Sequence, residues 1–413
     1  MVFLNLPAKE KTILRELAKK VAELSVSPIN KERRDRARDV NDLIPRKPIV
    51  WLNEFPWHEM DIDGKLRCIC EDGFARAMEQ NLRKTLYRWE YIQADMVLEK
   101  EYIIFKSYDD DMCELEIKEN KLYGDKESRI ASHEYIDQLD CLIEDNALKL
   151  PVVKADKIAD TRNLEWANEI LDGIMPVRLC GYFFYHAPWD LIIQLHGVEK
   201  TMVDLLERPE LMHATIKRFT EIGYSRMKQM ESEGLLGNGN PDIHFTPAYS
   251  SVTTKDQPAQ LKDVWFRGAA QILSAVSPAM WDEFELQYAK PLMAEFALVY
   301  YGCCEALDNK IPLLRTVPNL RKIGVSPWAN PEKCAEQIGG DYVFSYKPNP
   351  AAVAGAFDRE TTRAEIARVL ETCKKNGCPC EFILKDISTI SYKPTNLIEW
   401  VKTVMSTIDA FFR

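Results

Sequence analysis

Hydrophobic positions near the N-terminus recur at the period of an α-helix. Apolar side chains stand at Ile13, Leu17, Val21 and Leu24, and residues three or four positions apart lie on the same face of a helix. Charged residues occupy many of the intervening positions. We therefore expect residues 1–45 to form an N-terminal helical extension.

Beyond this extension, short apolar runs replace the helical period. The first is KPIVWLNEF, residues 47–55, which ends in polar residues as a buried strand does. From residue 176 onward, turn residues and a helical stretch follow the apolar runs, and this succession predicts parallel strands with helices outside. The later runs are VRLCGYFFY (177–185), PDIHFTPAY (241–249), DVWFRGAAQIL (263–273), ALVYYGCC (297–304), LRKIGVSPWA (320–329), DYVFSYKPN (341–349) and CEFILKDIS (380–388).

Residues 96–150 follow a different pattern. Apolar and polar residues alternate there in EYIIFKS and CELEIKENKLYG, which is the period of a half-buried strand. We expect a β-rich segment inserted into the main fold, made of antiparallel strands or of an irregular excursion.

Helix start signals and the number of repeating units indicate the fold. Ser277 followed by Pro278 is a helix cap with proline at the first helical position, and Trp281, Phe284 and Leu292 then line one face. Six or more strand–helix units without a glycine-rich dinucleotide motif favour a (β/α)8 TIM barrel, an α/β fold, over a doubly wound sheet. We expect residues 1–413 to form one such domain.

Composition narrows the classes of protein to consider. The chain has 413 residues, 46% hydrophobic and 29% charged, and a formal net charge of −10. This acidic balance argues against nucleic-acid binding, which needs a concentrated basic surface. No apolar run approaches the ~20 residues of a membrane span, and the charged N-terminal stretch is unlike a signal peptide. We expect a cytoplasmic protein that binds no membrane and whose eleven cysteines stay reduced.

Candidate chemistry gathers where the expected strands end. Active sites of TIM barrels lie at the carboxyl ends of the strands, and Cys303, Cys304 and Glu305 follow directly on the run ALVYY. Thiolates and carboxylates are ordinary zinc ligands. His244 in DIHFTP and Asp386 in ILKDIS come where other strands deliver side chains to the same mouth. The alternatives are core cysteines, a core histidine and a structural carboxylate paired with a backbone amide or with the neighbouring lysine.

A polar and aromatic cluster follows the first strand. Asn53, Glu54, Trp57, His58 and Glu59 suit the binding of a small polar ligand, and they suit closing the rim of the barrel equally well. Other expected strand ends contribute further side chains. The residues expected to bind substrate are Trp51, Asn53, Trp57, His186, Trp189 and Lys347.

A second group of cysteines precedes a strand instead of following one. The segment CKKNGCPC, residues 373–380, has the spacing of a metal cluster, but the strand EFILKD comes after it. In a TIM barrel this position belongs to the face that stabilises the fold. We therefore expect a structural role for these cysteines.

Two long motifs resemble the uroporphyrinogen decarboxylase superfamily. They are GYFFYHAPWDLIIQLHGVEKTMVDLLERPELMHATIKRFTEI (181–222) and LSAVSPAMWDEFELQYAKPL (273–292), which occur in the order of the superfamily's strand, glycine-rich turn and helices. The resemblance covers about residues 176–413, with a weaker fit near Pro48, and implies a TIM-barrel fold. It is specific to the superfamily and much less so to one activity.

The resemblance implies one of two activities. Porphyrinogen decarboxylases use arginines after the first strand, where this chain has NEFPWHEMD without arginine. Zinc-dependent methyltransferases that work with corrinoid proteins have a His-x-Cys motif, which falls on YYGCCE here. This chain departs from that pattern, with no histidine there and no cysteine near LKDIST. Two alternatives follow from this departure. Either the chain has lost the metal, or a changed set of ligands binds it, drawn from Cys303 or Cys304, Glu305, His244 and Asp386.

We therefore expect a methyltransferase that moves a methyl group between a small O- or N-methylated molecule and the cobalt of a separate corrinoid protein. Zinc at the strand ends would polarise the departing heteroatom, and Glu305, Glu54 or His58 would protonate it. One alternative is a decarboxylase or related lyase acting on a small carboxylated or tetrapyrrole-like substrate, with Lys347 or Lys385 as its electrostatic partner. Another is a barrel that binds a corrinoid or a metal without catalysis.

Overall fold

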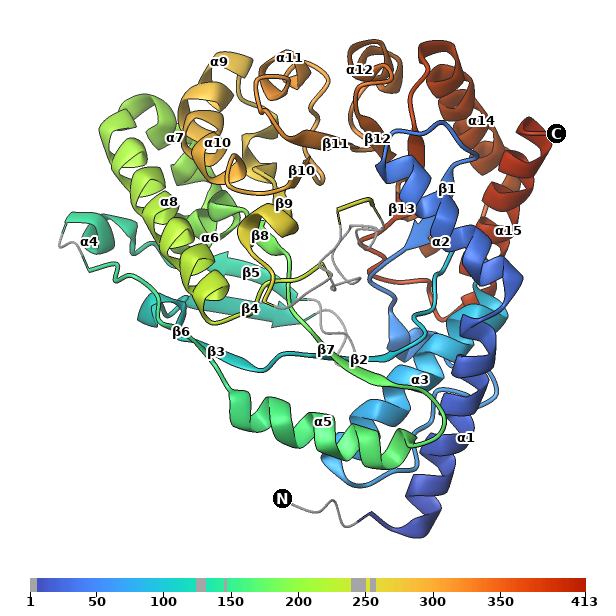
Figure 1. Ribbon diagram of the computed structural model, residues 1–413. Coiled ribbons are helices and arrows are strands. Elements are labelled where there is room, and N and C mark those ends of the chain that lie inside the picture. Colours follow the sequence, from blue (N-terminus) through green and yellow to red (C-terminus); the bar gives the residue numbers. More distant parts are fainter. Residues whose placement is uncertain (1–5, 124–130, 145–146, 239–249, 253–257) are drawn as a thin grey trace.

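The computed structural model of the protein describes residues 6–123, 131–144, 147–238, 250–252 and 258–413. Strands and helices alternate along much of this part of the chain (Figure 1). The strands are β1 Ile49–Leu52, β2 Tyr102–Phe105, β3 Tyr108–Asp110, β4 Glu119–Tyr123, β5 Ala131–Tyr135, β6 Val153–Ala155, β7 Val177–Cys180, β8 Phe184–His186, β9 Trp265–Gly268, β10 Leu298–Tyr301, β11 Leu320–Val325, β12 Val343–Tyr346 and β13 Cys380–Leu384. The helices are α1 Ala8–Ser25, α2 Pro28–Asn41, α3 Gly73–Tyr91, α4 Leu139–Glu144, α5 Lys157–Leu171, α6 Pro188–His196, α7 Val198–Glu207, α8 Pro209–Ser232, α9 Pro278–Trp281, α10 Gln287–Met293, α11 Ile311–Leu314, α12 Pro331–Ile338, α13 Ala351–Ala354, α14 Arg359–Asn376 and α15 Pro394–Phe411.

A seven-stranded parallel sheet forms the centre of the fold. Its strand order is β1-β13-β12-β11-β10-β9-β8, and every neighbouring pair runs parallel. Figure 1 shows these strands following one another round an arc, with α8, α10, α12 and α14 outside it. The expected α/β class is confirmed. Pairing between β1 and β8, which would close a barrel, is not seen among the described residues, and closure stays a prediction. The expected strand 241–249, with His244, lies outside those residues.

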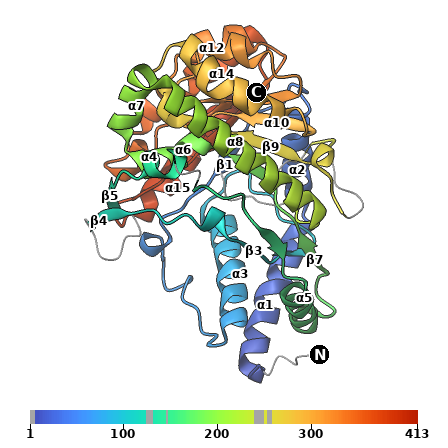
Figure 2. The same ribbon diagram turned by 90° about the vertical axis from the view of Figure 1, so that its left-hand side faces the viewer.

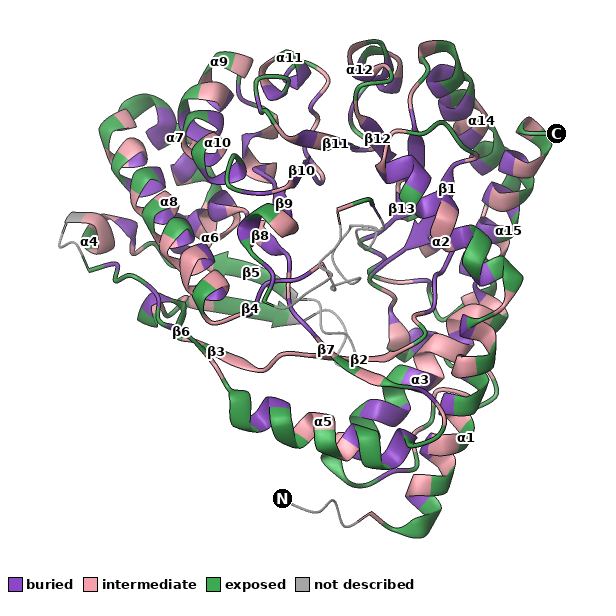
Figure 3. Ribbon diagram, viewed as in Figure 1, coloured by how far each residue is buried: buried purple, intermediate pink, exposed green. Residues whose placement is uncertain are grey.

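Side chains alternate between the two faces of this sheet. Residues such as Val50, Phe266 and Phe344 belong to the large hydrophobic core beneath the helices. Their chain neighbours point the other way, as strand geometry requires, and nearly all residues of both sets are buried (Figure 3). We call the second side the inner face. It carries Trp51, Asn53, Tyr185, Trp265, Arg267, Tyr300, Lys322, Ser345, Lys347, Glu381 and Lys385.

A second hydrophobic core lies among α1, α3 and α5. Leu14 and Val21 of α1 pack with Leu82 of α3 and Ile170 of α5. Figure 2 shows the three helices side by side at one end of the molecule. The helical period of the N-terminal sequence thus places α1 on its own core, which is separate from the one that surrounds the sheet.

The segment 96–150 forms small pairings outside the seven-stranded sheet. β4 pairs antiparallel with β5, β3 pairs antiparallel with β6, and β2 pairs parallel with β7. The run VRLCGYFFY, expected as one strand, is divided into β7 and β8. A Cβ atom at Gly181, between them, would lie 2.1 Å from the carbonyl oxygen of Leu236, so a neighbouring backbone passes too close for any side chain.

The connection from β9 to β10 contains a π-helical turn. Ser277 caps α9 as expected, because its Oγ accepts a hydrogen bond from the backbone N–H of Met280 at 3.2 Å. The π turn, Asp282–Leu286, joins α9 to α10, and such turns are frequent at functional sites. Within it, Glu285 accepts a hydrogen bond of 2.9 Å from the hydroxyl of Tyr301, the last residue of β10.

In the part of the chain that the structure describes, no helix combines the length and the apolar composition needed to cross a membrane.

Candidate active site

Thiols and charged residues meet at the carboxyl ends of three strands. β10 is followed by Cys303 and Cys304, β13 by Lys385 and Asp386, and β1 by Glu54. Because the strands are parallel, these ends lie at the same edge of the sheet. The structure thus brings together the cysteine pair and two of the carboxylates that the sequence singled out.

Cys304 is at the centre of the contacts. Its Sγ lies 3.9 Å from Sγ of Cys303, donates to a carboxylate oxygen of Asp386 at 3.4 Å, and accepts from Nζ of Lys385 at 2.9 Å. Lys385 also forms an ion pair with Asp386. Cys304 is half-buried, whereas Cys303 and Lys385 are buried, so the thiol pair lies between the interior and the surface.

A glycine makes the turn that presents the two thiols. Gly302 has a φ of +107°, which L side chains rarely adopt. A Cβ atom there would lie 2.7 Å from Cδ1 of Leu307 and 3.2 Å from the backbone nitrogen of Gly324. The break in the run YYGCCE is therefore a steric requirement of the turn.

Two residues at this edge have strained backbones. Glu54 and Asp386 have φ values of +57° and +54°, in the left-handed region that non-glycine residues avoid. They face each other, because the backbone N–H of Asp386 donates to a carboxylate oxygen of Glu54 at 2.8 Å. Strain of this kind clusters at functional sites, which supports a functional role for this edge.

Lys385 and the two thiols are electrostatically coupled. Burial alone would lower the pKa of the Lys385 ammonium, but Cys303, Asp386 and Cys304 raise it above its usual value. Hydrogen bonding to Cys303, together with burial, raises the pKa of Cys304 against the opposing effect of Lys385. Ionisation of one thiol therefore hinders ionisation of the other, and Lys385 supplies the positive charge beside them.

Glu305 is a buried carboxyl group held by the backbone. Its two oxygens accept hydrogen bonds from the N–H groups of Cys303 at 2.8 Å and Ala270 at 3.1 Å. Burial, followed by the nearby Cys303, raises the pKa of Glu305. The group both fixes the cysteine turn and retains a proton more readily than an exposed glutamate does.

The donor atoms at this edge are of the types that zinc prefers. Cys303, Cys304 and Asp386 supply two thiols and a carboxylate. Within the described residues, however, no group of three or more His, Cys, Asp and Glu side chains is arranged to hold a metal ion, and Lys385 is the cation beside Cys304. The fourth expected ligand, His244, lies outside those residues. Zinc binding therefore stays a prediction.

His186 ends β8 at this edge, but its side chain and that of Trp189 point away from the thiols. The ring of His186 packs against α8, where a Cβ atom at Gly223 would lie 2.5 Å from its Cε1, and burial lowers the pKa of His186 to about 4. Trp189 is buried in the large hydrophobic core. His186 shares the helix side with Phe184 because it stands two residues further along β8, and Trp189, on α6, belongs to the same core as Phe184.

The cluster after β1 packs mainly against neighbouring loops and α3. Trp57 lies 4.9 Å from the ring of Phe55 and 6.1 Å from that of Tyr87. His58 has its Nε2 atom 3.5 Å from Glu59. Glu59 itself is buried and accepts hydrogen bonds from the loop after β13, namely from Thr389 Oγ1 and the N–H groups of Ile390 and Tyr392.

Three other expected residues lie on the inner face. Trp51 donates from its indole nitrogen to Oδ1 of Asn53 at 2.6 Å. Lys347 is buried and donates to Oγ of Ser345 at 2.5 Å, and Ser345 donates to Glu381 at 2.6 Å. These contacts join Lys347 to a hydrogen-bonded network inside the sheet.

Arg267, Lys322 and Glu381 are charged residues of the inner face that the sequence reasoning did not identify. Burial lowers the pKa of Lys347 well below its usual value, Glu381 opposes this shift, and the cations Arg267, Lys322 and Lys385 add to it. Lys322 also pairs with Glu381 at 2.9 Å. The available signal was a charged residue inside an apolar strand run, as in VWFRG, LRKIG and CEFIL.

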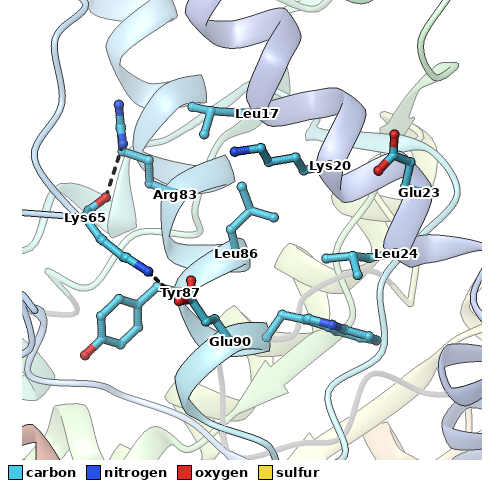
Figure 4. Close-up of a pocket in the computed structure, with 10 residues that line it drawn as sticks. Leu17, Lys20, Glu23, Leu24, Lys65, Arg83, Leu86, Tyr87 and Glu90 are labelled. Carbon is cyan, nitrogen blue, oxygen red and sulfur yellow. Dashed lines mark hydrogen bonds and ion pairs between the residues drawn. The ribbon is translucent and has the colours of Figure 1, made fainter.

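A cavity of about 460 Å³ lies elsewhere, between α1 and α3 (Figure 4). Leu17, Leu24 and Leu86 contribute apolar lining, and Figure 4 shows the ion pair of Lys65 with Glu90 beside them. None of the expected site residues that the structure describes lines this cavity. The strand edge, and not this cavity, therefore carries the candidate chemistry.

Comparison with known proteins supports the fold. A solved structure described as a methyltransferase from Methanosarcina mazei is similar to this chain, with 13% sequence identity and a TM-score of 0.51. The match covers 92% of this chain and 99% of that one. No protein-family model matches the sequence, and no curated protein matches it. At this identity the likeness establishes a shared α/β fold over nearly the whole chain.

Proposed function

We propose that the protein is an enzyme, a methyltransferase that moves a methyl group between a small O- or N-methylated molecule and the cobalt of a corrinoid protein. The observation that carries the proposal is the pair Cys303 and Cys304 beside Lys385, Asp386 and Glu305 at the carboxyl edge of the parallel sheet. Likeness in fold to a protein described as a methyltransferase supports it. The proposal takes the seven-stranded sheet as part of a (β/α)8 barrel.

The chain's own residues would meet the main chemical demand of this reaction. When a methyl group leaves an ether or an amine without its bonding electrons, the pair stays on the heteroatom, which must gain a proton to leave as a neutral group. Glu305 is the candidate donor, because burial raises the pKa of its carboxyl group above the usual value. Glu54 and His58 are further candidates, but both lie closer to the solvent.

Zinc and the corrinoid protein are parts of the proposal. Cys303, Cys304 and Asp386, with His244, would hold the zinc ion, which would polarise the heteroatom that carries the methyl group. Lys385 would have to leave its position beside Cys304 for the thiolate to bind the metal. The role proposed for Glu305 does not depend on the metal.

The decisive experiment is incubation of the purified protein with reduced cobalamin and a panel of methoxylated and N-methylated compounds. Formation of methylcobalamin, followed by its absorption spectrum, would support the proposal. Metal analysis of the same sample should find about one zinc per chain, and the double variant with Cys303→Ser and Cys304→Ser should lose it. Activity in a metal-free sample would remove zinc from the mechanism, and no methylcobalamin with any compound would contradict the methyltransferase.

A second candidate is a decarboxylase or related lyase acting on a small carboxylated substrate. It is favoured by Lys347, a buried amine at the end of β12 whose pKa burial lowers well below its usual value. Lys385, at the end of β13, adds a positive charge to the same face. Release of carbon dioxide without methylcobalamin would identify this activity. Cobalamin binding without either product would indicate a barrel that binds a corrinoid and does not catalyse.

A further inference from the structure

Arg267 is a buried cation that has no counter-ion within the described part of the chain. Its side chain on β9 is fully buried. Nη2 donates to the carbonyl oxygen of Gly302 at 3.4 Å, but Nε and Nη1 have no hydrogen-bond partner among the described residues. A guanidinium group stays charged in proteins, and burying a charge without partners is costly. The position therefore calls for a group that the described residues do not supply.

Two tyrosine rings flank the guanidinium group. Arg267 is in register with Tyr185 on β8 and with Tyr300 on β10, and its Cζ atom lies 5.2 Å and 4.9 Å from their ring centroids. Cation–π contacts of this kind use the flat faces of the guanidinium. Its N–H bonds point within the plane, so the two rings stabilise the charge without satisfying the donors.

The surrounding charges add to the need for an anion. Lys322 and Lys347 lie on the same inner face as Arg267. Glu381 pairs with Lys322 directly and is linked to Lys347 through the hydroxyl of Ser345. Glu305 and Asp190 act on Arg267 through space, but neither forms an ion pair with it, and the hydrogen bond seen for its guanidinium among the described residues goes to the carbonyl oxygen of Gly302. Glu381 is thus already bonded to Lys322 and Ser345 and forms no ion pair with Arg267 among the described residues.

We propose that Arg267 binds a carboxylate group of the substrate. Two in-plane donors match the two oxygens of a carboxylate. The contact with Gly302 places the guanidinium beside the turn that carries Cys303, so a carboxylate held there leaves the rest of the molecule near the thiols. The substrate class is then a small carboxylic acid with a methylated oxygen or nitrogen. The methylated oxygen or nitrogen of this substrate rests on the proposed function. The binding of its carboxylate by Arg267 does not.

The test is a thermal-shift titration, which does not require activity. The probes are methoxyacetate, 3-methoxypropionate and 4-methoxybenzoate, each compared with its neutral amide, and inorganic phosphate. Wild type should be stabilised by at least one carboxylate more than by its amide. Arg267→Met should weaken that binding at least about 30-fold, the loss expected when one partner of a buried charge pair is removed, and Arg267→Lys should recover part of it.

Two further comparisons separate a binding role from a structural one. Without probe, Arg267→Met should melt at the same temperature as wild type or higher, because it removes unsatisfied buried donors. Arg321→Met is the matched control, since Arg321 lies at the other end of the sheet, on β11, and donates to the carbonyl oxygen of Asn41 at 2.8 Å. It should leave carboxylate binding unchanged.

Several results would overturn the proposal. Equal stabilisation of wild type by every acid and its amide would exclude a carboxylate site, and preference for phosphate would assign the site to a phosphate ester. A fall in melting temperature of Arg267→Met with unchanged carboxylate binding would make Arg267 a structural residue. If the carboxylates bind through Arg267 but no methylcobalamin forms, the anion site stands and the proposed methyltransferase fails.

Discussion

The two ends of the parallel sheet both carry cysteines, but in different surroundings. Cys303 and Cys304 follow β10 at the carboxyl ends of the strands, whereas Cys373, Cys378 and Cys380 precede or begin β13 at the amino ends. We refer to these as the carboxyl-end pair and the amino-end group. Both sets are free thiols, so any difference in behaviour must come from their neighbours.

Charged partners distinguish the carboxyl-end pair. Cys304 contacts Lys385 at 2.9 Å and Asp386 at 3.4 Å. In the amino-end group, Cys378 donates to the carbonyl oxygen of Ala335 at 3.5 Å, and hydrogen bonding to Cys373 and burial raise its pKa. A metal-like spacing of cysteines is therefore a weaker indication of chemistry than the charges beside them.

The largest expected effect is the loss of activity when the carboxyl-end pair is changed. The double variant Cys303→Ser, Cys304→Ser should reduce methyl transfer at least about 1000-fold, because it removes the thiolates that would hold the metal. Cys378→Ser is the matched control, since Cys378 is half-buried like Cys304 and a serine keeps its hydrogen bond. It should retain activity within about 3-fold. Initial rates of methylcobalamin formation would test both variants. Equal losses of activity in the two would contradict a special role for the carboxyl-end pair.

The next effect concerns the buried acid beside the pair. Glu305→Gln should lower the rate about 100-fold or more, the usual contribution of a positioned proton donor, because the amide keeps one acceptor but cannot give up a proton. The folded state should persist, since the side chain can still accept from Ala270 or Cys303. Rates measured alongside circular dichroism would test this. Full activity of the variant would show that Glu305 only shapes the turn.

Glu285, which supports β10 from the helix side, should make stability depend on pH. Burial raises the pKa of Glu285 from its usual 4.5 to about 8, so the folded protein keeps a proton that the unfolded chain has lost. The free energy of unfolding should therefore fall by a few kcal/mol as pH rises from about 4.5 to about 8, because each pH unit between the two pKa values removes about 1.4 kcal/mol. Urea unfolding across this range would measure it.

The matching variants isolate the contribution of Glu285. Glu285→Gln should flatten the decline and be more stable than wild type at pH 8, because it removes the ionising group from the buried site. Glu371→Gln, at an exposed position on α14, should leave the decline unchanged. A wild-type slope that survives Glu285→Gln would mean that another titrating group causes it.

Much of the sheet could be predicted because its strands are apolar runs of ordinary length. KPIVWLNEF, ALVYYGCC and CEFILKDIS each contain one strand of the parallel sheet, and parallel order alone places Cys303 and Asp386 at one edge. The same rule failed for VRLCGYFFY, because the close approach of Leu236 to Gly181 depends on a distant segment. Tertiary contacts, which no local pattern contains, divided that run in two.

The contents of the inner face were harder to predict. Alternation says that Arg267 and Phe266 point to opposite sides, but not which side is lined by helices. His186 and Trp189 were assigned to substrate from their position after a strand, and they lie in or against the helix-side core. In the strands that carry Arg267, Lys322 and Glu381, the apolar chain neighbours of these residues face the helices, so the charged residues face the other way. This rule would have placed all three on the inner face.

The smallest expected effect concerns the reactivity of the thiols. Alkylation needs the thiolate, and the Lys385 ammonium at 2.9 Å stabilises that form of Cys304. Lys385→Gln should therefore slow the alkylation of Cys304 by iodoacetamide about 10-fold at pH 8, as measured by mass spectrometry of digested samples. Cys378 should be unaffected, because Lys385 does not contact it.

A control at the other end of the sheet makes this test specific. Lys375→Gln removes a positive charge two positions from Cys373 in the amino-end group, and it should leave the alkylation of both Cys304 and Cys378 unchanged. Treating wild type with a chelator should speed the alkylation of Cys304 if zinc masks the thiolate. Equal slowing of Cys304 and Cys378 in Lys385→Gln would indicate a global change in the fold. An unchanged rate at Cys304 would show that the charge of Lys385 does not act on the thiol, and the electrostatic contrast between the two cysteine groups would then be wrong.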